Sequence, residues 1–492
     1  MILTVDAGTS VTKVALWDES GMVALAGTPV ATRHPAPGLA EQDPMEWWSS
    51  VVGSCARLRE QVPGGLGSVE AVGCTGARQT FALVDADGGT LGPGIVWSDR
   101  RAPVGAEGSA ALPGAESDPV TRSGVGADAG SVAAKIAWLV AHEPGRVEAS
   151  AWILAPRDLI VWRLTGTVAT DATMASRTGL YDPEGRVAED LADDLAAAVR
   201  SRLPGVVPSD RVTGRLRAEA AAALGLVAGL PVVIGAGDRP SEVLGSGATE
   251  SVPMVSWGTT ANVSIPVGSY PQEPPPGVVV SRAAGRGWLL EGGLSAAGSL
   301  LAWLGAMTGR PPAELAELAL QSPPGGRGVV ATPWLEGARA PWWKPGAAAA
   351  FTGLTSAHGP ADLARAAFES VAWEAQRCLR AFGTRQPPGP AVSGLALGGS
   401  GADVPVWLDV LTGITGLGAV ARRSGQAASA GAALLAAVAI GLDYELDLID
   451  PVVTRSRPVP AAVHRYAELA EQSEQVAAAV VGLAASGGSP CG

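Results

Sequence analysis

The sequence is poor in cysteine, histidine and lysine. Its 492 residues include four cysteines and four histidines, and its lysines are Lys13, Lys135 and Lys344. The cysteines, at positions 55, 74, 378 and 491, show no paired spacing and do not cluster with the histidines. This distribution predicts reduced thiols, buried Cys74 and Cys378, and no zinc site. No lysine follows a glycine or precedes serine or threonine, which excludes a P-loop enzyme.

Long apolar runs and positive charge are also scarce. The first residues lack the basic and apolar regions of a signal peptide, and the longest apolar run, residues 431–440, is too short to cross a bilayer. We therefore expect a soluble cytoplasmic protein that does not bind membranes. The net charge of -12 and the pI near 5.0 leave no broad basic face for nucleic acid, although a small anion could still bind in a local pocket.

Two Gly-Thr turns stand between apolar strands. The first, Gly8-Thr9, lies between Asp6 and Lys13, and the second, Gly258-Thr259, lies within residues 254–265. Glycine adopts the backbone angles of a tight turn and leaves amides and a hydroxyl open to a phosphate. A carboxylate such as Asp6 can hold a metal ion, and the ammonium of Lys13 can neutralise phosphate charge. Each turn taken alone is equally compatible with an ordinary hairpin.

Two further glycine-rich turns follow apolar strands. Residues 231–234 run into Gly235-Ala-Gly-Asp238, where a carboxylate at the end of a strand can take a proton from a substrate hydroxyl. The alternative is that Asp238 only caps the following helix. Gly398, Gly399 and Ser400 precede a helix and offer backbone amides to an anion or to the edge of an adenine ring, or they form a plain turn.

The length and the order of predicted elements indicate an α/β protein of two domains. Each half begins with strands joined by a Gly-Thr turn, and each continues into helices and further strands. We expect the domain change near residues 240–250. The predicted segments are a first domain over 1–245, a second over 246–450, and a C-terminal helix with a frayed tail over 451–492.

In their order along the chain these motifs resemble those of the FGGY carbohydrate kinases. The resemblance covers about residues 1–445. It rests on Asp6-Ala-Gly-Thr-Ser with Lys13, Glu41-Gln-Asp-Pro, Trp97-Ser-Asp99-Arg-Arg, Lys135-Ile-Ala-Trp, Pro156-Arg-Asp158, Thr170-Asp171, Gly235-Ala-Gly-Asp238, Gly258-Thr-Thr, residues 333–341 and the loop at Gly398.

The resemblance implies two actin-like, ribonuclease H-like ATPase domains that flank a cleft, with ATP and Mg²⁺ as cofactors. It implies that Asp238 is the general base and that Asp6, with Asp238, lies at the metal. The residues expected at the nucleotide and its phosphates are Gly8, Thr9, Lys13, Gly258, Thr259, Gly398, Gly399 and Ser400. We assign Arg78, Gln79, Asp99 and Asp238 to the sugar.

The substrate-side turn departs from both of the family patterns nearest to it. Xylulokinases read SGQMHG and glycerol kinases read NQRET, whereas this chain reads TGARQT over residues 75–80. The rest of the pattern is closer to xylulokinase, so we expect phosphorylation of a ketopentose such as D-xylulose. Glycerol or another polyol is the alternative within this class, and an aldonate is a third. The nucleotide loop also departs from its pattern, reading GGSGAD where GGGARS is usual.

A non-catalytic, actin-like nucleotide-binding module is the alternative outside enzymes. A chaperone-type ATPase would need a long client-binding domain after the nucleotide part, and a pseudokinase would be expected to lose Asp6 or Asp238. Both carboxylates are present, and only a short segment follows residue 450. A homodimer remains open, because the sequence does not fix the oligomeric state.

Overall fold

The computed structural model describes residues 1–102, 130–189, 191–384 and 389–486. The chain forms two compact units. Unit 1 comprises Met1–Gly245, Val280–Trp288 and Ala427–Pro451, and unit 2 comprises Ser246–Val279, Leu289–Gln426 and Val452–Gly492. The sequence-based division assigns residues 280–288 and 427–450 to the second domain and residue 451 to the C-terminal segment, whereas the structure packs all of them in unit 1. Local patterns do not reveal such long-range packing. Cys491 and the end of the predicted tail lie outside the described residues.

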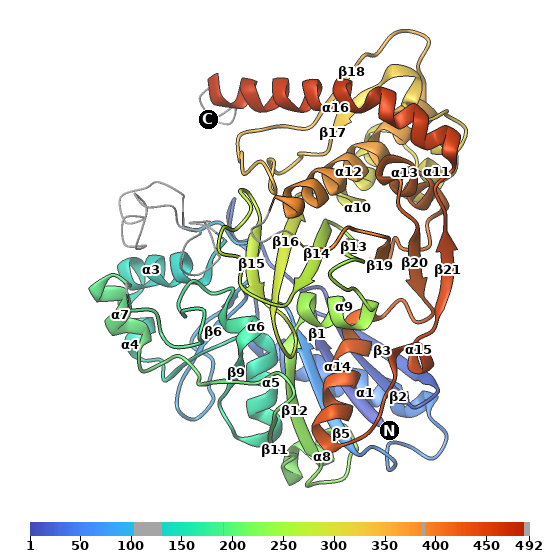
Figure 1. Cartoon of the computed structure of the whole chain (residues 1–492). Coiled ribbons are helices and arrows are strands. Elements are labelled where there is room, and N and C mark those ends of the chain that lie inside the picture. The colour runs from blue at the N-terminus through green and yellow to red at the C-terminus, as the bar shows by residue number, and fades with distance from the viewer. Residues whose placement is uncertain (103–129, 190, 385–388, 487–492) are drawn as a thin grey trace. The chain divides into compact units, whose positions relative to one another are not determined.

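Unit 1 is built on a sheet of six strands in the order β11-β12-β5-β1-β2-β3 (Figure 1). The strands of unit 1 are β1 (Ile2–Ala7), β2 (Val11–Asp18), β3 (Gly21–Pro29), β4 (Glu41–Gln42), β5 (Ala71–Gly76), β6 (Ala82–Val84), β7 (Gly94–Ile95), β8 (Trp152–Leu154), β9 (Thr170–Asp171), β10 (Val206–Val207), β11 (Val212–Arg215) and β12 (Pro231–Gly237). Its helices are α1 (Pro44–Gln61), α3 (Val132–His142), α4 (Pro144–Glu148), α5 (Pro156–Thr165), α6 (Ala172–Ala175), α7 (Asp193–Val199), α8 (Ala218–Leu224), α9 (Asp238–Ser246), α14 (Ala427–Ile440) and α15 (Leu446–Ile449).

Three neighbouring strands of this sheet run in parallel. β1 pairs with β5 and β5 pairs with β12 in parallel, whereas β1, β2 and β3 form an antiparallel meander, as the sequence predicts. The carboxyl ends of β1, β5 and β12 therefore lie at one edge of the sheet. In α/β sheets this edge is the usual place for a ligand.

Apolar side chains on both faces of the sheet are covered by helices. Along β1, Leu3 and Val5 pack in one cluster with α1, α5 and α8, and Ile2 packs in another with α14. This alternation follows from the two-residue period of a strand. Helix α1 begins as the sequence predicts, because the side chain of Asp43 accepts a hydrogen bond from the amide of Met45 and Pro44 occupies the first helical position.

Unit 2 contains a second sheet, in which the strands follow the order β16-β14-β13-β19-β20-β21. The remaining strands are β13 (Met254–Trp257), β14 (Ala261–Val267), β15 (Val279–Arg282), β16 (Trp288–Leu294), β17 (Val330–Thr332), β18 (Ala350–Thr352), β19 (Leu395–Gly398), β20 (Ala419–Arg422) and β21 (Val452–Ser456). The remaining helices are α10 (Gly298–Thr308), α11 (Pro312–Ala319), the short 3₁₀ helix η2 (Gly326–Gly328), α12 (Pro360–Gly383), α13 (Pro405–Thr415) and α16 (Pro460–Ser486).

Within unit 2, the antiparallel hairpin β13–β14 contains the second Gly-Thr turn, and β13 pairs in parallel with β19. The long helix α12 is fixed to α13 and α16 by a buried polar group. The guanidinium of Arg365 donates to the hydroxyl of Tyr466 at 2.6 Å and forms ion pairs with Glu369 and Asp409, each at 2.9 Å. The C-terminal helix is therefore an integral part of unit 2 up to its described end.

No helix within the described residues is both long enough and apolar enough to span a membrane. The apolar run at 431–440 instead belongs to α14, which packs on β5, β1 and β12 of unit 1 (Figure 1).

Helix α14 approaches its neighbours closely because its sequence supplies glycine and alanine. A Cβ atom on Gly431 would lie 2.0 Å from the carbonyl oxygen of Ser241 in α9, and one on Gly245 would lie 1.9 Å from that of Ala427. A Cβ on Gly73 of β5 would lie 2.7 Å from the carbonyl oxygen of Ala432. The backbones of α9 and α14 can lie this close only because Gly245 and Gly431 have no side chains.

Replacing Gly431 with alanine should therefore destabilise the protein. We expect the free energy of unfolding to fall by about 1–3 kcal/mol, the usual cost of overpacking. The control is Gly482→Ala, at an exposed position of α16, where an added Cβ meets nothing within 4 Å and alanine should raise helix stability by up to about 1 kcal/mol. Equal stability of the two variants in denaturant titrations would contradict the close packing of α9 and α14.

Candidate active site

Three of the segments singled out in the sequence lie at the carboxyl edge of the parallel strands in unit 1. The Gly8-Thr9 turn follows β1, Arg78 and Gln79 follow β5, and Asp238 follows β12. The sequence places these residues far apart along the chain, and parallel pairing brings the ends of their strands together.

The Gly8-Thr9 turn is held by two side chains. The side-chain amide of Gln42 donates to the carbonyl oxygen of Thr9 at 2.6 Å, and the indole N–H of Trp97 donates to its hydroxyl at 3.1 Å. A Cβ on Gly8 would lie 2.7 Å from the carbonyl oxygen of Val11, so the turn requires glycine there. The sequence motifs contain Gln42 and Trp97, but no local signal indicates that both hold the turn.

Asp6 is an unusual carboxyl group. It lies opposite Lys13 on the antiparallel pair β1–β2, and its Oδ1 atom is buried without a hydrogen-bond partner among the described residues. Burial, together with the nearby charge of Asp238 and a smaller effect of Glu242, raises the pKa of Asp6 to about 7, although Lys13 opposes the shift. Asp6 therefore holds a proton much more readily than an exposed aspartate does.

These features suit a bound cation. The buried Oδ1 of Asp6 has no hydrogen-bond partner among the described residues, and the charge of Asp238 raises the pKa of Asp6. A cation bound between the two carboxylates would stabilise both of them. The described residues contain no group of three or more metal-ligating side chains. Magnesium commonly uses only one or two protein carboxylates and takes its other ligands from water and substrate phosphates, so Asp6 and Asp238 fit that ion.

Asp238 is the first residue of α9 and remains accessible. Its Oδ1 accepts a hydrogen bond from the amide of Arg239 at 2.7 Å and lies 3.6 Å from Nε of Arg78. The side chain of Asp238 is 43% exposed, whereas that of Arg78 is 10% exposed. Asp238 thus interacts with the start of the helix and still presents a carboxylate to solvent, so capping and proton abstraction are compatible.

Gln79 lies in a tight turn supported by buried cations. Its φ of 59° falls in the left-handed region, and its carbonyl oxygen accepts a hydrogen bond from Nζ of Lys135 at 3.4 Å. The same ammonium donates to the carbonyl oxygen of Val96 at 2.7 Å, and Arg177 donates to Oε1 of Gln79 at 3.2 Å. The side-chain direction of Gln79 is therefore fixed by unit 1 itself.

Asp99, which the sequence analysis assigns to a sugar hydroxyl, lies inside unit 1. Asp99 is 0% exposed, and its two oxygens accept hydrogen bonds from the guanidinium and amide of Arg101 and from the amide of Ala40. These hydrogen bonds and the ion pair lower its pKa against the effect of burial, which acts in the opposite direction. In this structure Asp99 holds Arg101, and its role at the sugar stays a prediction.

Unit 2 contains a pocket of about 540 Å³ that includes two of the predicted nucleotide segments. Gly258 and Thr259 line it from the end of β13, and Ser400 and Gly401 line it from the end of β19. Parallel pairing of these strands explains why the two loops meet. The rest of the wall is mostly apolar and comes from Trp257, α10, α11, α12 and Val404.

Trp257 joins the two loops of this pocket. Its carbonyl oxygen accepts a hydrogen bond from the amide of Gly401 at 3.1 Å, and a Cβ on Gly399, whose φ is 77°, would lie 2.2 Å from that oxygen. The turn therefore requires glycine at position 399, whereas Ser400 lines the pocket. The departure from the family pattern at Ser400 thus falls on the pocket wall.

Family models match most of the chain. The N-terminal domain model of the FGGY family of carbohydrate kinases matches residues 1–245, and the C-terminal domain model matches residues 254–440. The chain belongs to this family. It is accordingly a two-domain, actin-like sugar or polyol kinase, as the resemblance of the motifs predicts.

Similar proteins include kinases for two kinds of acceptor. The chain is 31% identical to the xylulose kinase of Escherichia coli over 478 residues, covering 95% of this chain and 96% of that protein. It is also 31% identical to the glycerol kinase of Leptothrix cholodnii over 469 residues, covering 91% and 92%. The structure of xylulose kinase from Rhodospirillum rubrum superimposes with a TM-score of 0.85 at 27% identity, covering 98% of this chain and 99% of that one. Overall similarity therefore does not decide the acceptor.

The raised pKa of Asp6 implies that the stability of the folded protein depends on pH. Between the unfolded pKa near 3.8 and the folded pKa near 7, the folded protein binds the proton more tightly, so Asp6 makes stability fall as pH rises through that range. Asp6→Asn removes this dependence. We expect the melting temperature of the variant to exceed that of the wild type by more at pH 8 than at pH 5.

The exposed residue Glu19, in the turn between β2 and β3, provides the control for that experiment. Glu19→Gln should leave the difference from wild type nearly constant between pH 5 and pH 8. The same constant difference for Asp6→Asn would show that the Asp6 carboxyl titrates normally.

Proposed function

We propose that this kinase transfers the γ-phosphoryl group of ATP to a hydroxyl of a ketopentose such as D-xylulose, with Asp238 as general base. The observation that carries the proposal is the exposed carboxylate of Asp238 at the end of a parallel strand, beside the guanidinium of Arg78. Arginine supplies directional donors for sugar oxygens, and the carboxylate accepts the proton of the reacting hydroxyl.

The proposed reaction needs little covalent chemistry from the protein. Asp238 accepts the hydroxyl proton while the hydroxyl oxygen bonds to the γ-phosphorus and the bond to the ADP oxygen breaks. Phosphoryl transfer depends mainly on positioning and charge neutralisation. Charge neutralisation suits the ammonium of Lys13 and the backbone amides and hydroxyl of the Gly8-Thr9 turn.

The nucleotide is assigned to the pocket of unit 2. Its apolar wall suits an adenine ring, and Thr259 and Ser400 offer hydroxyls beside the backbone amides of their glycine turns. In this assignment Gly258 and Thr259 contact phosphate, and Gly398, Gly399 and Ser400 form the loop next to adenosine.

Magnesium is assigned to Asp6 and Asp238. When bound, the ion would neutralise charge on the phosphate oxygens. The deep position of Asp6 Oδ1 and the raised pKa of this carboxyl support the assignment.

The acceptor is assigned to Arg78 and Gln79 together with Asp238. The turn that carries them matches neither of the two family patterns, and the fixed direction of Gln79 restricts which hydroxyl it can reach. Glycerol or another polyol is the second candidate, because Arg78 occupies the position of the arginine in the glycerol kinase pattern and its guanidinium lies beside Asp238.

An ADP-release screen with Asp238→Asn as the comparison tests this proposal. We expect a pentulose to give the highest kcat/KM among pentuloses, hexuloses, aldonates, glycerol and tetritols. Asp238→Asn should lower kcat by about 10²–10⁴-fold, the usual contribution of positioned proton transfer. The control is Asp210→Asn, at an exposed aspartate of unit 1. Near-wild-type turnover in Asp238→Asn would leave Asp238 as a helix cap, and preference for glycerol would select the second candidate.

A separate prediction concerns the pocket of unit 2. Thr259→Val preserves the shape of the side chain and removes its hydroxyl, so the KM for ATP should rise severalfold while the KM for the acceptor changes little. Thr384→Val removes an exposed hydroxyl at the end of α12 and should change neither constant. If Thr259→Val raises the acceptor KM instead, the pocket does not bind the nucleotide.

A further inference from the structure

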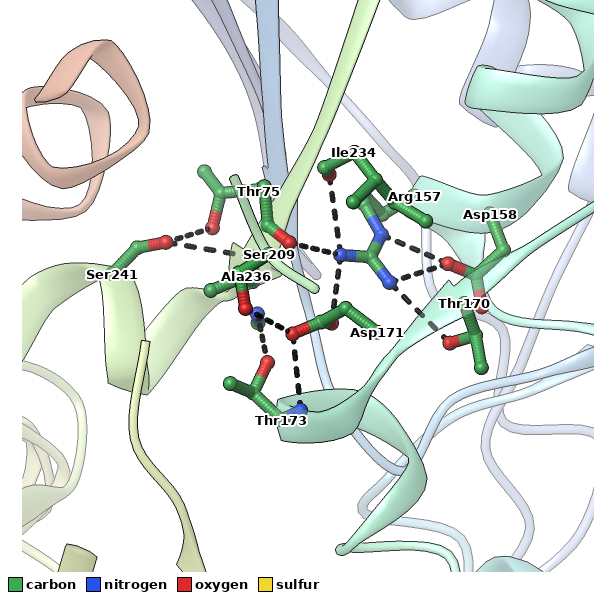
Figure 2. Close-up of polar contacts among 12 residues, drawn as sticks. Thr75, Arg157, Asp158, Thr170, Asp171, Thr173, Ser209, Ile234, Ala236 and Ser241 are labelled. Carbon is green, nitrogen blue, oxygen red and sulfur yellow. Dashed lines mark hydrogen bonds and ion pairs between the residues drawn. The ribbon is translucent and has the colours of Figure 1, made fainter. Parts of the chain in front are cut away.

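A buried polar network lies directly behind the end of β12. At its centre is Arg157, the second residue of α5, whose side chain is 0% exposed (Figure 2). Its Nε and Nη2 atoms donate to Asp158 Oδ1 at 2.8 and 2.6 Å, and its Nη1 donates to Asp171 Oδ1 at 2.9 Å. Asp158 and Asp171 are also buried, so this network imposes a strict geometry.

The same guanidinium holds an irregular segment of β12. The pairing of β12 with β5 shifts register between Val233 and Ala236, and Gly235 within the shift has a φ of 70°. A Cβ on Gly235 would lie 1.6 Å from the carbonyl oxygen of Cys74. Arg157 Nη1 donates to the carbonyl oxygens of Ile234 and Gly235 at 3.2 and 2.9 Å (Figure 2), so it binds the strand where its regular pairing is interrupted.

Asp171 extends the network toward the proposed base. Its Oδ2 accepts hydrogen bonds from the hydroxyl of Ser209 at 2.7 Å and from the amide of Thr173 at 3.0 Å. The second of these bonds caps the N-terminus of the short helix α6. The hydroxyl of Thr173 in turn accepts a hydrogen bond from the amide of Gly237 at 2.8 Å. Gly237 is the residue immediately before Asp238.

The other side of the same segment is held by β5 and α9. The hydroxyl of Thr75 donates to the hydroxyl of Ser241 at 3.1 Å, and that hydroxyl donates to the carbonyl oxygen of Ala236 at 3.5 Å (Figure 2). Residues 234–237 are therefore bound by side chains on both sides, and all of these side chains are buried.

We propose that Thr173, oriented by Asp171 and Arg157, is a positioning residue that fixes Asp238 through the amide of Gly237. This inference rests on the proposed role of Asp238 as general base. Proton transfer requires a base within hydrogen-bond distance of the hydroxyl, and a displacement of about 1 Å can cost on the order of 10²-fold in rate. A backbone amide held one residue before the base restricts such a displacement.

The experiment compares Thr173→Val with Thr173→Ser. Valine keeps the shape of the side chain but leaves the amide of Gly237 without its acceptor, whereas serine retains a hydroxyl. Thr173→Val should lower kcat about 10- to 100-fold with the KM for ATP within about twofold of wild type. Thr173→Ser should recover kcat to within about threefold of wild type.

A control variant distinguishes positioning from the general loss of a hydroxyl that is hydrogen-bonded to the backbone. Thr165, which is half-buried at the end of α5, likewise accepts a hydrogen bond from a backbone amide, that of Thr167, and its hydroxyl donates to the carbonyl oxygen of Val161; neither partner belongs to β12. Thr165→Val should leave kcat within about twofold of wild type. A comparable loss of kcat in both valine variants would show that Thr173 acts only through stability.

The decisive measurement repeats Thr173→Val in the Asp238→Asn background under single-turnover conditions. If Thr173 acts through the base, the second substitution should change the residual rate by less than about twofold, because coupled residues are not additive. An undiminished 10- to 100-fold loss in that background, or wild-type kcat in Thr173→Val alone, overturns the inference. Full activity of Asp238→Asn would instead refute the proposed base itself.

Ser209→Ala provides a second route if Thr173→Val does not fold. It removes one hydrogen bond to Asp171 and leaves Thr173 in place. We expect a smaller loss of kcat, about 3- to 10-fold, that again disappears in the Asp238→Asn background. An unchanged kcat in Ser209→Ala, measured on a folded variant, counts against the positioning role.

Discussion

Parallel pairing of β1, β5 and β12 is the constraint on which unit 1 depends. It aligns the carboxyl ends of three strands that are far apart in sequence, and each of these ends carries a polar segment. The same rule operates in unit 2, where β13 and β19 bring Thr259 and Ser400 to one pocket. In both units the parallel pairing of the strands determines which loops lie next to each other, and the positions of the polar side chains follow from that pairing.

Much of the site could be predicted because its signals are local. A glycine turn after an apolar strand is visible within a short stretch of sequence, so the sequence predicts the turns at Gly8, Gly258 and Gly398 and the turn at the end of β12. The signal for the start of α1, Asp43 followed by Pro44, is also confined to neighbouring residues. The roles of Asp6, Asp238 and the turns remain predictions, although the geometry around them is compatible with those roles.

The remaining features depend on contacts between distant segments. Helix α12 is one such feature. Its charged residues Arg365, Glu369 and Arg377 are paired inside unit 2, whereas a sequence pattern places charges of this kind on the solvent face of a helix. The contacts of Asp99 with Arg101 and Ala40 also escape sequence reasoning, because Ala40 lies in a distant segment and its amide carries no sequence signal. The network of Arg157, Asp171 and Thr173 involves four separate segments, and no local pattern predicts it.

The protonation of Asp6 has a consequence for the stoichiometry of ligand binding. Because its pKa is raised toward neutrality, this carboxyl is partly protonated in a neutral solution. Any ligand that requires its ionised form must release that fraction of a proton to the buffer. For such a ligand, the heat of binding near neutral pH includes the ionisation enthalpy of the buffer, so the apparent binding enthalpy depends on which buffer is chosen.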